Sequence, residues 1–211
     1  TAYMMGLDLN DPRGQRVLDD LDRSAEMYEG SGTDFGTNSF MNGHVHAAFI
    51  RQDWIEALRA AQAVLAFCRR QRIALEQEAL SLARLAEAQR KTGDLDAALQ
   101  SASEGLALAQ RQGARLHAIH CHLELVRALL QAGGDTETES GIREHLDDAM
   151  QLVEDTDARA FAPQIIEERG RLAATLGHAD AARTELEAAH EAYVEIGADG
   201  HAQRLATELG L

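Results

Sequence analysis

Apolar residues recur along this chain at the three- and four-residue spacing of amphipathic helices, in segments separated by short polar turns. In residues 54–70, for example, Ile55, Leu58, Leu65 and Cys68 fall on one helical stripe. Long segments of this kind fill most of the chain, and the sequence therefore predicts an all-α protein. The predicted helices cover residues 14–29, 38–51, 54–70, 73–91, 95–111, 114–132, 138–153, 161–176, 179–196 and 199–209.

A repeat organises these helices. Ala57, Ala98 and Ala182 hold the same place in three similar segments, each beginning at a polar turn. The first two alanines are 41 residues apart, and the last two are 84 apart, which is two periods of 42. A repeat of this length with two helices in each unit is typical of a solenoid. We expect a right-handed α-α superhelix.

The repeat also sets the expected domain layout. Residues 1–13 lack periodicity and read as an irregular leader, and residues 14–211 read as one domain. The segment 14–29 looks like the second helix of a pair whose first helix is missing, so we expect a fragment of a longer protein. The helix pairs are predicted at 38–70, 73–111, 114–153 and 161–196, with a half repeat at 14–29 and a capping helix at 199–209.

Composition narrows the class of partner. The formal net charge is −15, from 35 acidic and 20 basic residues. An acidic surface repels a phosphate backbone, so we expect no direct binding of nucleic acid. No apolar run is long enough for a membrane span and no secretion signal is seen, and a cytoplasmic protein is expected. Cys68 and Cys121 lie among apolar helical neighbours and are predicted to be reduced core residues.

The glycine-rich segment 30–36 contains Asp34-Phe35-Gly36, the letters of a kinase magnesium motif. No catalytic loop or glycine-rich phosphate loop accompanies these residues. We therefore predict a loop between helices at this place, without a catalytic role.

The helix pairs resemble tetratricopeptide repeats, in the longer variety of about 40 residues. The resemblance covers residues 14–209, although the large aromatic positions of the family are mostly aliphatic here and the proline that ends each repeat is absent. It implies close helix contacts at the family's small positions. The matching packing positions are Leu82, Leu85, Ala86, Ala88, Ala98, Ala102, Gly105, Gly170, Ala182, Leu186 and Ala189.

A narrower resemblance concerns the last third of the chain. Residues 161–172 are similar to a recurrent segment of bacterial multidomain class III adenylate cyclases and of LuxR-type regulators with an ATPase module. Residues 192–205 are similar to the extreme C-terminus of such cyclases. In those families the repeat array follows the ATPase module and acts as a sensor or scaffold. The resemblance implies that any cyclase, ATPase or DNA-binding activity belongs to domains outside this chain.

The best candidate for chemistry is a histidine cluster at 117–122. His117, His120 and Cys121 share one helical face, as metal ligands at i, i+3 and i+4 would. His122 is predicted to point elsewhere. A metal would need a further ligand from another helix, and a packed core cysteine explains Cys121 equally well. No nucleophile and base can be paired, so we expect a protein that is not an enzyme and has no cofactor.

In a superhelix of this kind, the first helix of each pair lines the concave groove. The expected lining mixes carboxylates, amides and a few bases, and a partner protein or peptide with positive charge would complement the acidic part. The predicted groove residues are Asn42, His46, Ala83, Glu87, Arg90, Lys91, Glu124, Ala128, Gln131, Glu167 and Arg171.

The sequence favours a non-catalytic scaffold or regulatory module for protein–protein interaction, within a larger bacterial signalling protein. A small-molecule sensor that binds an effector in the groove is a second interpretation, and a metal-binding protein a third. A plain spacer with a solvated groove is the simplest alternative. Homodimers could also form through an exposed terminal helix, where a cut array leaves apolar surface.

Overall fold

A computed structural model describes residues 12–29, 32–133 and 136–211. These residues form ten α-helices and two short 3₁₀ turns, with no strand, and the predicted all-α class is confirmed. The predicted leader lies outside the described residues except for Pro12 and Arg13, which open α1. The helices are α1 (Pro12–Glu29), α2 (Asp34–Ile50), α3 (Trp54–Gln71), α4 (Glu78–Lys91), α5 (Leu95–Gln112), α6 (Arg115–Ala132), α7 (Thr136–Thr156), α8 (Ala162–Thr175), α9 (Ala179–Glu195) and α10 (Asp199–Leu209).

Aspartates at the polar turns begin two of these helices. The Asp53 carboxylate accepts a hydrogen bond from the Glu56 N–H at 3.1 Å, and the Asp94 carboxylate accepts one from the Ala97 N–H at 3.1 Å. Each bond satisfies an amide that the first helical turn leaves without a partner. Gly93, just before Asp94, has a φ of +92°, a backbone conformation that glycine adopts at little cost.

The segment 30–36 differs from the prediction. Thr33 Oγ1 accepts a hydrogen bond from the Gly36 N–H at 3.0 Å, so Asp34, Phe35 and Gly36 form the first turn of α2 and not a loop. Residues 30 and 31 lie outside the described part of the chain. Helix α7 is also longer than predicted, because it begins at Thr136 and continues to Thr156.

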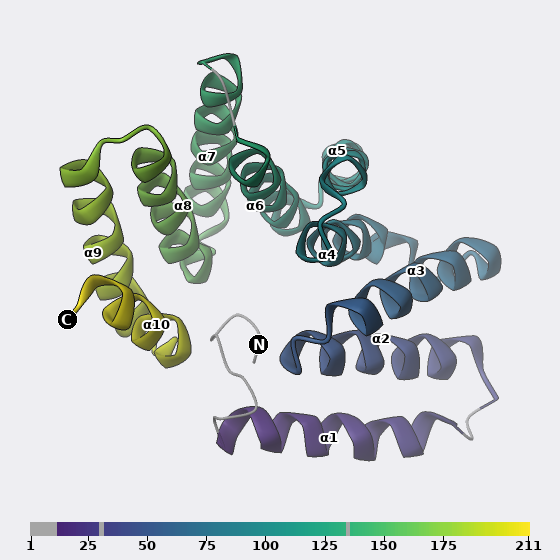
Figure 1. Ribbon diagram of the computed structural model, residues 1–211. Helices are drawn as coiled ribbons and strands as arrows, with labels where there is room; N and C mark the ends of the chain where they lie inside the picture. Colours follow the sequence, from purple (N-terminus) through teal and green to yellow (C-terminus); the bar gives the residue numbers. More distant parts are fainter. Residues whose placement is uncertain (1–11, 30–31, 134–135) are drawn as a thin grey trace.

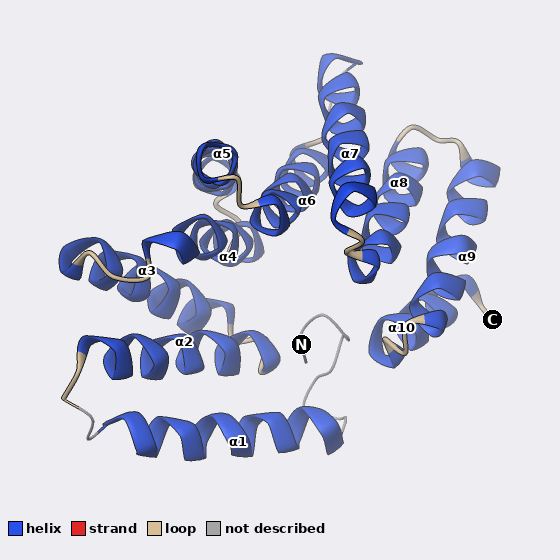
Figure 2. Cartoon of the chain, turned by 180° about the vertical axis from the view of Figure 1, so that it is seen from behind, coloured by secondary structure: helices blue, strands red, loops and turns tan. Residues whose placement is uncertain are grey.

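Consecutive helices pack side by side around an open arc (Figures 1 and 2). Besides these chain neighbours, α4 contacts α6 and α6 contacts α8. The two ends of the arc are joined by a surface ion pair, in which an Arg13 Nη1 on α1 donates to Asp199 Oδ2 on α10 at 2.9 Å.

The apolar core is a series of clusters between successive helices. One cluster, with Phe49 and Val64, joins α2 to α3, and another, with Ile119, Leu146 and Ile165, joins α6, α7 and α8. Each helix therefore buries its apolar stripe mainly against its neighbours in the chain. Among the described residues, no helix combines the length and the apolar character that a membrane span requires.

Two glycines allow neighbouring helices to approach closely. A Cβ atom at Gly105 on α5 would lie 2.9 Å from Cys121 Sγ and 3.2 Å from the Ala79 carbonyl oxygen. A Cβ atom at Gly170 on α8 would lie 2.8 Å from Leu186 Cγ and 3.2 Å from the Leu186 backbone nitrogen. Since these separations are shorter than ordinary van der Waals contacts, both positions exclude a side chain.

We expect Gly170→Ala to lower the free energy of unfolding by about 1 to 3 kcal/mol, because the added methyl group overpacks the contact with α9. Gly141→Ala is the matched control, since nothing lies within 4 Å of a Cβ atom there in helix α7. The control should raise the free energy of unfolding by about 0.5 to 1 kcal/mol through helix propensity. Urea unfolding followed by circular dichroism measures both, and equal effects would contradict the close approach.

Candidate functional site

A cavity of about 260 Å³ lies on the inner side of the arc. It is lined by residues of α1, α2, α4, α6 and α8, while α5 and α7 lie farther from the middle of the arc in Figure 1. One part of its wall is apolar, and another part is strongly polar. The lining residues are Val17, Leu21, His46, Phe49, Ile50, Leu80, Ala83, Arg84, Glu87, His120, Glu124, Arg127 and Gln164.

A buried ladder of charged side chains connects the inner helices. Glu124 on α6 accepts from Arg90 Nε on α4 at 3.0 Å and from Arg127 Nη1 at 2.7 Å. Arg127 then reaches α8, where its Nε donates to Glu168 Oε1 at 2.7 Å and its Nη2 to Gln164 Oε1 at 3.0 Å. We call these five residues, Arg90, Glu124, Arg127, Gln164 and Glu168, the inner ladder.

The electrostatics of the inner ladder depend on Glu124, which is only 4% exposed. Burial alone would raise the pKa of this carboxyl group, but the Arg127 and Arg90 guanidiniums outweigh burial and hold the pKa below its usual value. The carboxylate therefore stays ionised at neutral pH. Both of its oxygens are already engaged by arginines of this chain.

A second charged cluster ties α8 to the last two helices. Glu167 Oε2 accepts from the Tyr193 hydroxyl at 3.0 Å and from Arg204 Nη2 at 2.8 Å. Arg171 Nη2 donates to Glu208 Oε2 at 2.6 Å and to Glu167 Oε1 at 3.3 Å. Glu167 and Arg171 are thus neutralised within the chain, and they hold α10 against α8.

Arg84 on α4 stands apart from both clusters. It is partly buried in the cavity wall, and its hydrogen bond to Asn42 Oδ1 is long, at 3.5 Å. No carboxylate among the described residues lies within ion-pair distance of its guanidinium, although Arg90 and Arg127 each have two such partners. Burial lowers the pKa of Arg84, and the nearby Glu87 charge offsets only part of this effect. An arginine stays charged in a protein, so the wall carries a cation that no carboxylate of the described residues pairs.

His46 and His120 flank this cation in the cavity. Burial, and then the positive charge of Arg84, lower the pKa of each imidazole to about 4. Both rings are therefore neutral near pH 7 and can donate or accept hydrogen bonds. The His120 ring also packs edge-on against Phe161, with 4.9 Å between ring centroids.

Only some of the residues predicted to line the groove lie in the cavity wall. His46, Ala83, Glu87 and Glu124 line the cavity, and Arg90 joins the inner ladder behind it. Asn42 donates to the Asn38 carbonyl oxygen at 3.0 Å and accepts from Arg84.

Five other predicted residues lie away from the cavity wall, among them Glu167 of the α8–α10 cluster. The Lys91 ammonium lies 5.1 Å from the centroid of the Trp54 ring on α3, Ala128 is buried, and Gln131 is exposed at the end of α6. Arg171, as described above, belongs to the α8–α10 cluster.

Sequence reasoning missed most of the polar partners. Arg84 and Arg127 follow the same helical faces as the predicted Glu87 and Glu124, and could have been found by extending those faces one turn. The ladder residues Gln164 and Glu168 come from a helix about 40 residues further along. Their pairing with Arg127 depends on the relative rotation of two helices, which no local pattern records.

His117, His120 and Cys121 do not form the ligand set considered for a metal. His117 Nδ1 is buried without a hydrogen-bond partner among the described residues, and His120 lines the cavity. Cys121 is fully buried, and burial raises the pKa of its thiol to about 12, so it remains protonated. The free thiols of Cys68 and Cys121 are both buried, as predicted.

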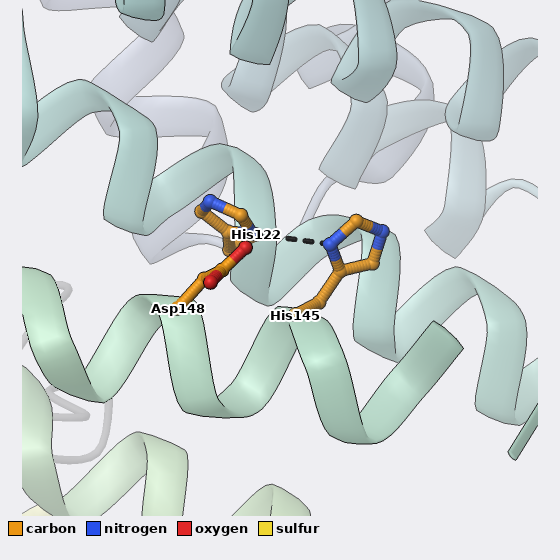
Figure 3. Close-up of side chains that lie close together, drawn as sticks. All are labelled: His122, His145 and Asp148. Atoms are coloured by element: carbon orange, nitrogen blue, oxygen red, sulfur yellow. Dashed lines mark hydrogen bonds between the residues drawn. The ribbon is translucent and has the colours of Figure 1, made fainter. Parts of the chain in front are cut away.

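Three other side chains meet instead between α6 and α7. Figure 3 shows His122 of α6 facing His145 and Asp148 of α7. One donor atom from each residue lies within 4.8 Å of the others, and this is the only group of potential metal ligands in the described part of the chain. His122 points away from the first candidate set, as its helical position predicted, while no sequence pattern indicated its partners His145 and Asp148.

Comparisons with known proteins add a likeness of fold. A scan of protein-family models and a search of curated proteins both find no match for this chain. Among solved structures, the crystal structure of BtubC (BKLC) from P. vanneervenii is similar, with a TM-score of 0.64. The alignment covers 95% of this chain and 91% of BtubC at 14% identity, so the likeness concerns the fold alone.

Replacing the two cavity arginines should have opposite effects on stability. Arg127→Met leaves Glu168 and one side of Glu124 buried without a counter-charge, and should lower the free energy of unfolding by about 3 to 5 kcal/mol. Arg84→Met removes a cation that no carboxylate in the described part of the chain pairs, and should leave stability unchanged or raise it by about 1 kcal/mol. Thermal and urea unfolding of both variants measure the difference, and a comparable loss in the two would contradict the assignment.

Stability should fall as pH falls from about 6.5 towards 4. The pKa of His46 and of His120 is about 4 in the folded chain and 6.5 in the unfolded chain, so the unfolded chain binds more protons in this window. His120→Gln should make the free energy of unfolding less dependent on pH between these values, and the double variant His46→Gln/His120→Gln less dependent still. Unfolding curves at several pH values test this, and parallel profiles for all three proteins would refute it.

Proposed function

We propose that this chain is a non-catalytic binding module of the cytoplasm, a tetratricopeptide-like superhelix that takes up a segment of a partner protein on its inner face. The observation that carries the proposal is Arg84, a guanidinium in the wall of a partly apolar cavity that has no carboxylate partner within residues 12–29, 32–133 and 136–211. A buried charge of this kind costs stability unless a ligand completes it. Its presence on the inner face favours binding over a purely structural spacer.

The helix arrangement supports this proposal. The pairs follow each other along the chain, and the cavity is lined by α1 together with α2, α4, α6 and α8, of which the last four are the first helices of the predicted pairs. An extended concave surface of this kind is how repeat arrays hold peptides. The small residues at Gly105 and Gly170 agree with the packing positions of tetratricopeptide repeats.

The charges decide which segment would fit. The carboxylates of the inner ladder and of the α8–α10 cluster are already paired with arginines, so they offer little to the basic partner that the composition suggested. Arg84 instead favours a carboxylate, which it could bind through two parallel hydrogen bonds. The neighbouring Val17, Phe49 and Leu80 favour an apolar side chain beside it. We therefore infer a partner segment in which an acidic group adjoins an apolar residue.

A small carboxylate-bearing effector is the second candidate. The cavity volume of about 260 Å³ is at the lower end of the range for small-molecule sites, and the ion pair between Arg13 and Asp199 joins the ends of the arc around it. Such a ligand would make the module a sensor. The similarity of residues 161–172 to phrases in bacterial cyclases and regulators supports either role within a larger signalling protein.

A peptide library displayed on phage tests the proposal. The purified chain should enrich peptides that contain Asp or Glu next to an apolar residue, and synthetic versions should bind at least about tenfold more weakly to Arg84→Met, which removes a charge-assisted hydrogen bond. Arg59→Gln is the matched control, because Arg59 is exposed on α3 and pairs only locally with Glu56. This control should bind like the unaltered chain.

The outcome separates the two candidates. Failure to enrich any acidic peptide, or equal binding by Arg84→Met, would refute the proposed peptide groove. If small carboxylates then raise the melting temperature of the unaltered chain and not that of Arg84→Met, the sensor is the correct interpretation. If neither ligand class depends on Arg84, the inner face is a spacer surface.

A further inference from the structure

His122, His145 and Asp148 bring two imidazoles and one carboxylate together on the side of α6 away from the cavity. His122 is 3% exposed, His145 is partly buried, and Asp148 is exposed. His145 and Asp148 are three residues apart on α7, so both project towards His122 from one helical face. Neither the cavity nor the inner ladder uses any of these side chains.

The spacing of the two histidines matches that of ligands on one metal ion. Their Nδ1 atoms are 3.2 Å apart. Two nitrogen atoms that bind one tetrahedral Zn²⁺ at about 2.0 to 2.1 Å are separated by about 3.3 Å. With Asp148, the donor atoms lie within 4.8 Å of one another, a spread that small side-chain rotations can reduce to coordination distance.

Both histidines are also in the protonation state that a metal requires. Burial, and then the charge of His145, lower the pKa of His122 to about 4, and burial likewise lowers the pKa of His145. Neutral imidazoles can hold a metal without first losing a proton. Without a metal, the two Nδ1 atoms face each other, and one of them must carry the hydrogen that it donates to the other.

We propose that His122, His145 and Asp148 form a binding site for a divalent transition-metal ion of the zinc type, which clasps α6 to α7. Imidazole suits zinc, nickel, cobalt and copper ions, while magnesium and calcium prefer sites made of oxygen alone. Three protein donors leave the fourth tetrahedral position to water or to an outside ligand. The bound ion would fix α7 after the connector that separates it from α6.

Titration of the untagged chain with ZnCl₂ tests the site after chelator treatment and dialysis. Calorimetry should give one Zn²⁺ per chain, and the melting temperature should rise with zinc concentration because the ion binds the folded state. CoCl₂ should give the intense visible absorption of four-coordinate cobalt. MgCl₂ at the same concentrations should give neither signal.

Two variants locate the ion. His145→Gln should abolish binding of one equivalent, and Asp148→Asn should weaken it at least about tenfold. Glu154→Gln is the matched control, because it removes an exposed carboxylate two turns further along α7, and it should bind zinc like the unaltered chain. Asp148→Asn changes an exposed side chain, so it keeps the test decisive if His145→Gln fails to fold. Absence of zinc binding by the unaltered chain, or binding unchanged in Asp148→Asn, would overturn the site.

Discussion

The inner face depends on the pairing of carboxylates that the fold has removed from water. Glu124 is buried between α4 and α8, and an unpaired carboxylate there would cost several kcal/mol. Arg90 supplies one guanidinium from the preceding inner helix, and Arg127 carries the interaction on to Glu168. The inner ladder therefore fixes three helices that are not neighbours in the chain. It also pairs Glu124 and Glu168 with arginines of the chain, so these two carboxylates are not free to bind a basic partner.

The close approach of neighbouring helices is a second constraint, and it acts on inner and outer helices alike. Gly105 and Gly170 have no room for a Cβ atom, and Ala57, Ala98 and Ala102 are fully buried. Small residues at these positions set the separation of the two helices in a pair. On the inner side, ion pairs connect one helix pair to the next. Between the helices, apolar clusters make the same connection. Charge pairing therefore acts on the inner face of the helices, and close packing acts on the faces that meet neighbouring helices.

This division explains what the sequence could and could not predict. Helix periodicity, the polar turns that begin the repeated segments and the small residue at Gly170 are local signals, and they predicted the helices and the positions of close packing. The identity of an arginine's partner is not local. Arg84 and Arg90 look equivalent in the sequence, yet only Arg90 meets a carboxylate on α6, because the rotation of α6 decides which one is reached. The contact of His145 with His122 could not be predicted for the same reason.

The cation beside the Trp54 ring has a practical consequence for spectroscopy. Trp54 is the single tryptophan of the chain, and Lys91, its single lysine, lies over the ring from the end of α4. The indole also packs edge-on against Phe49, which lines the cavity. Its fluorescence thus originates at the junction of α2, α3 and α4, one side chain away from any occupant of the cavity. The fluorescence of Trp54 can therefore report on the cavity without an attached fluorescent label.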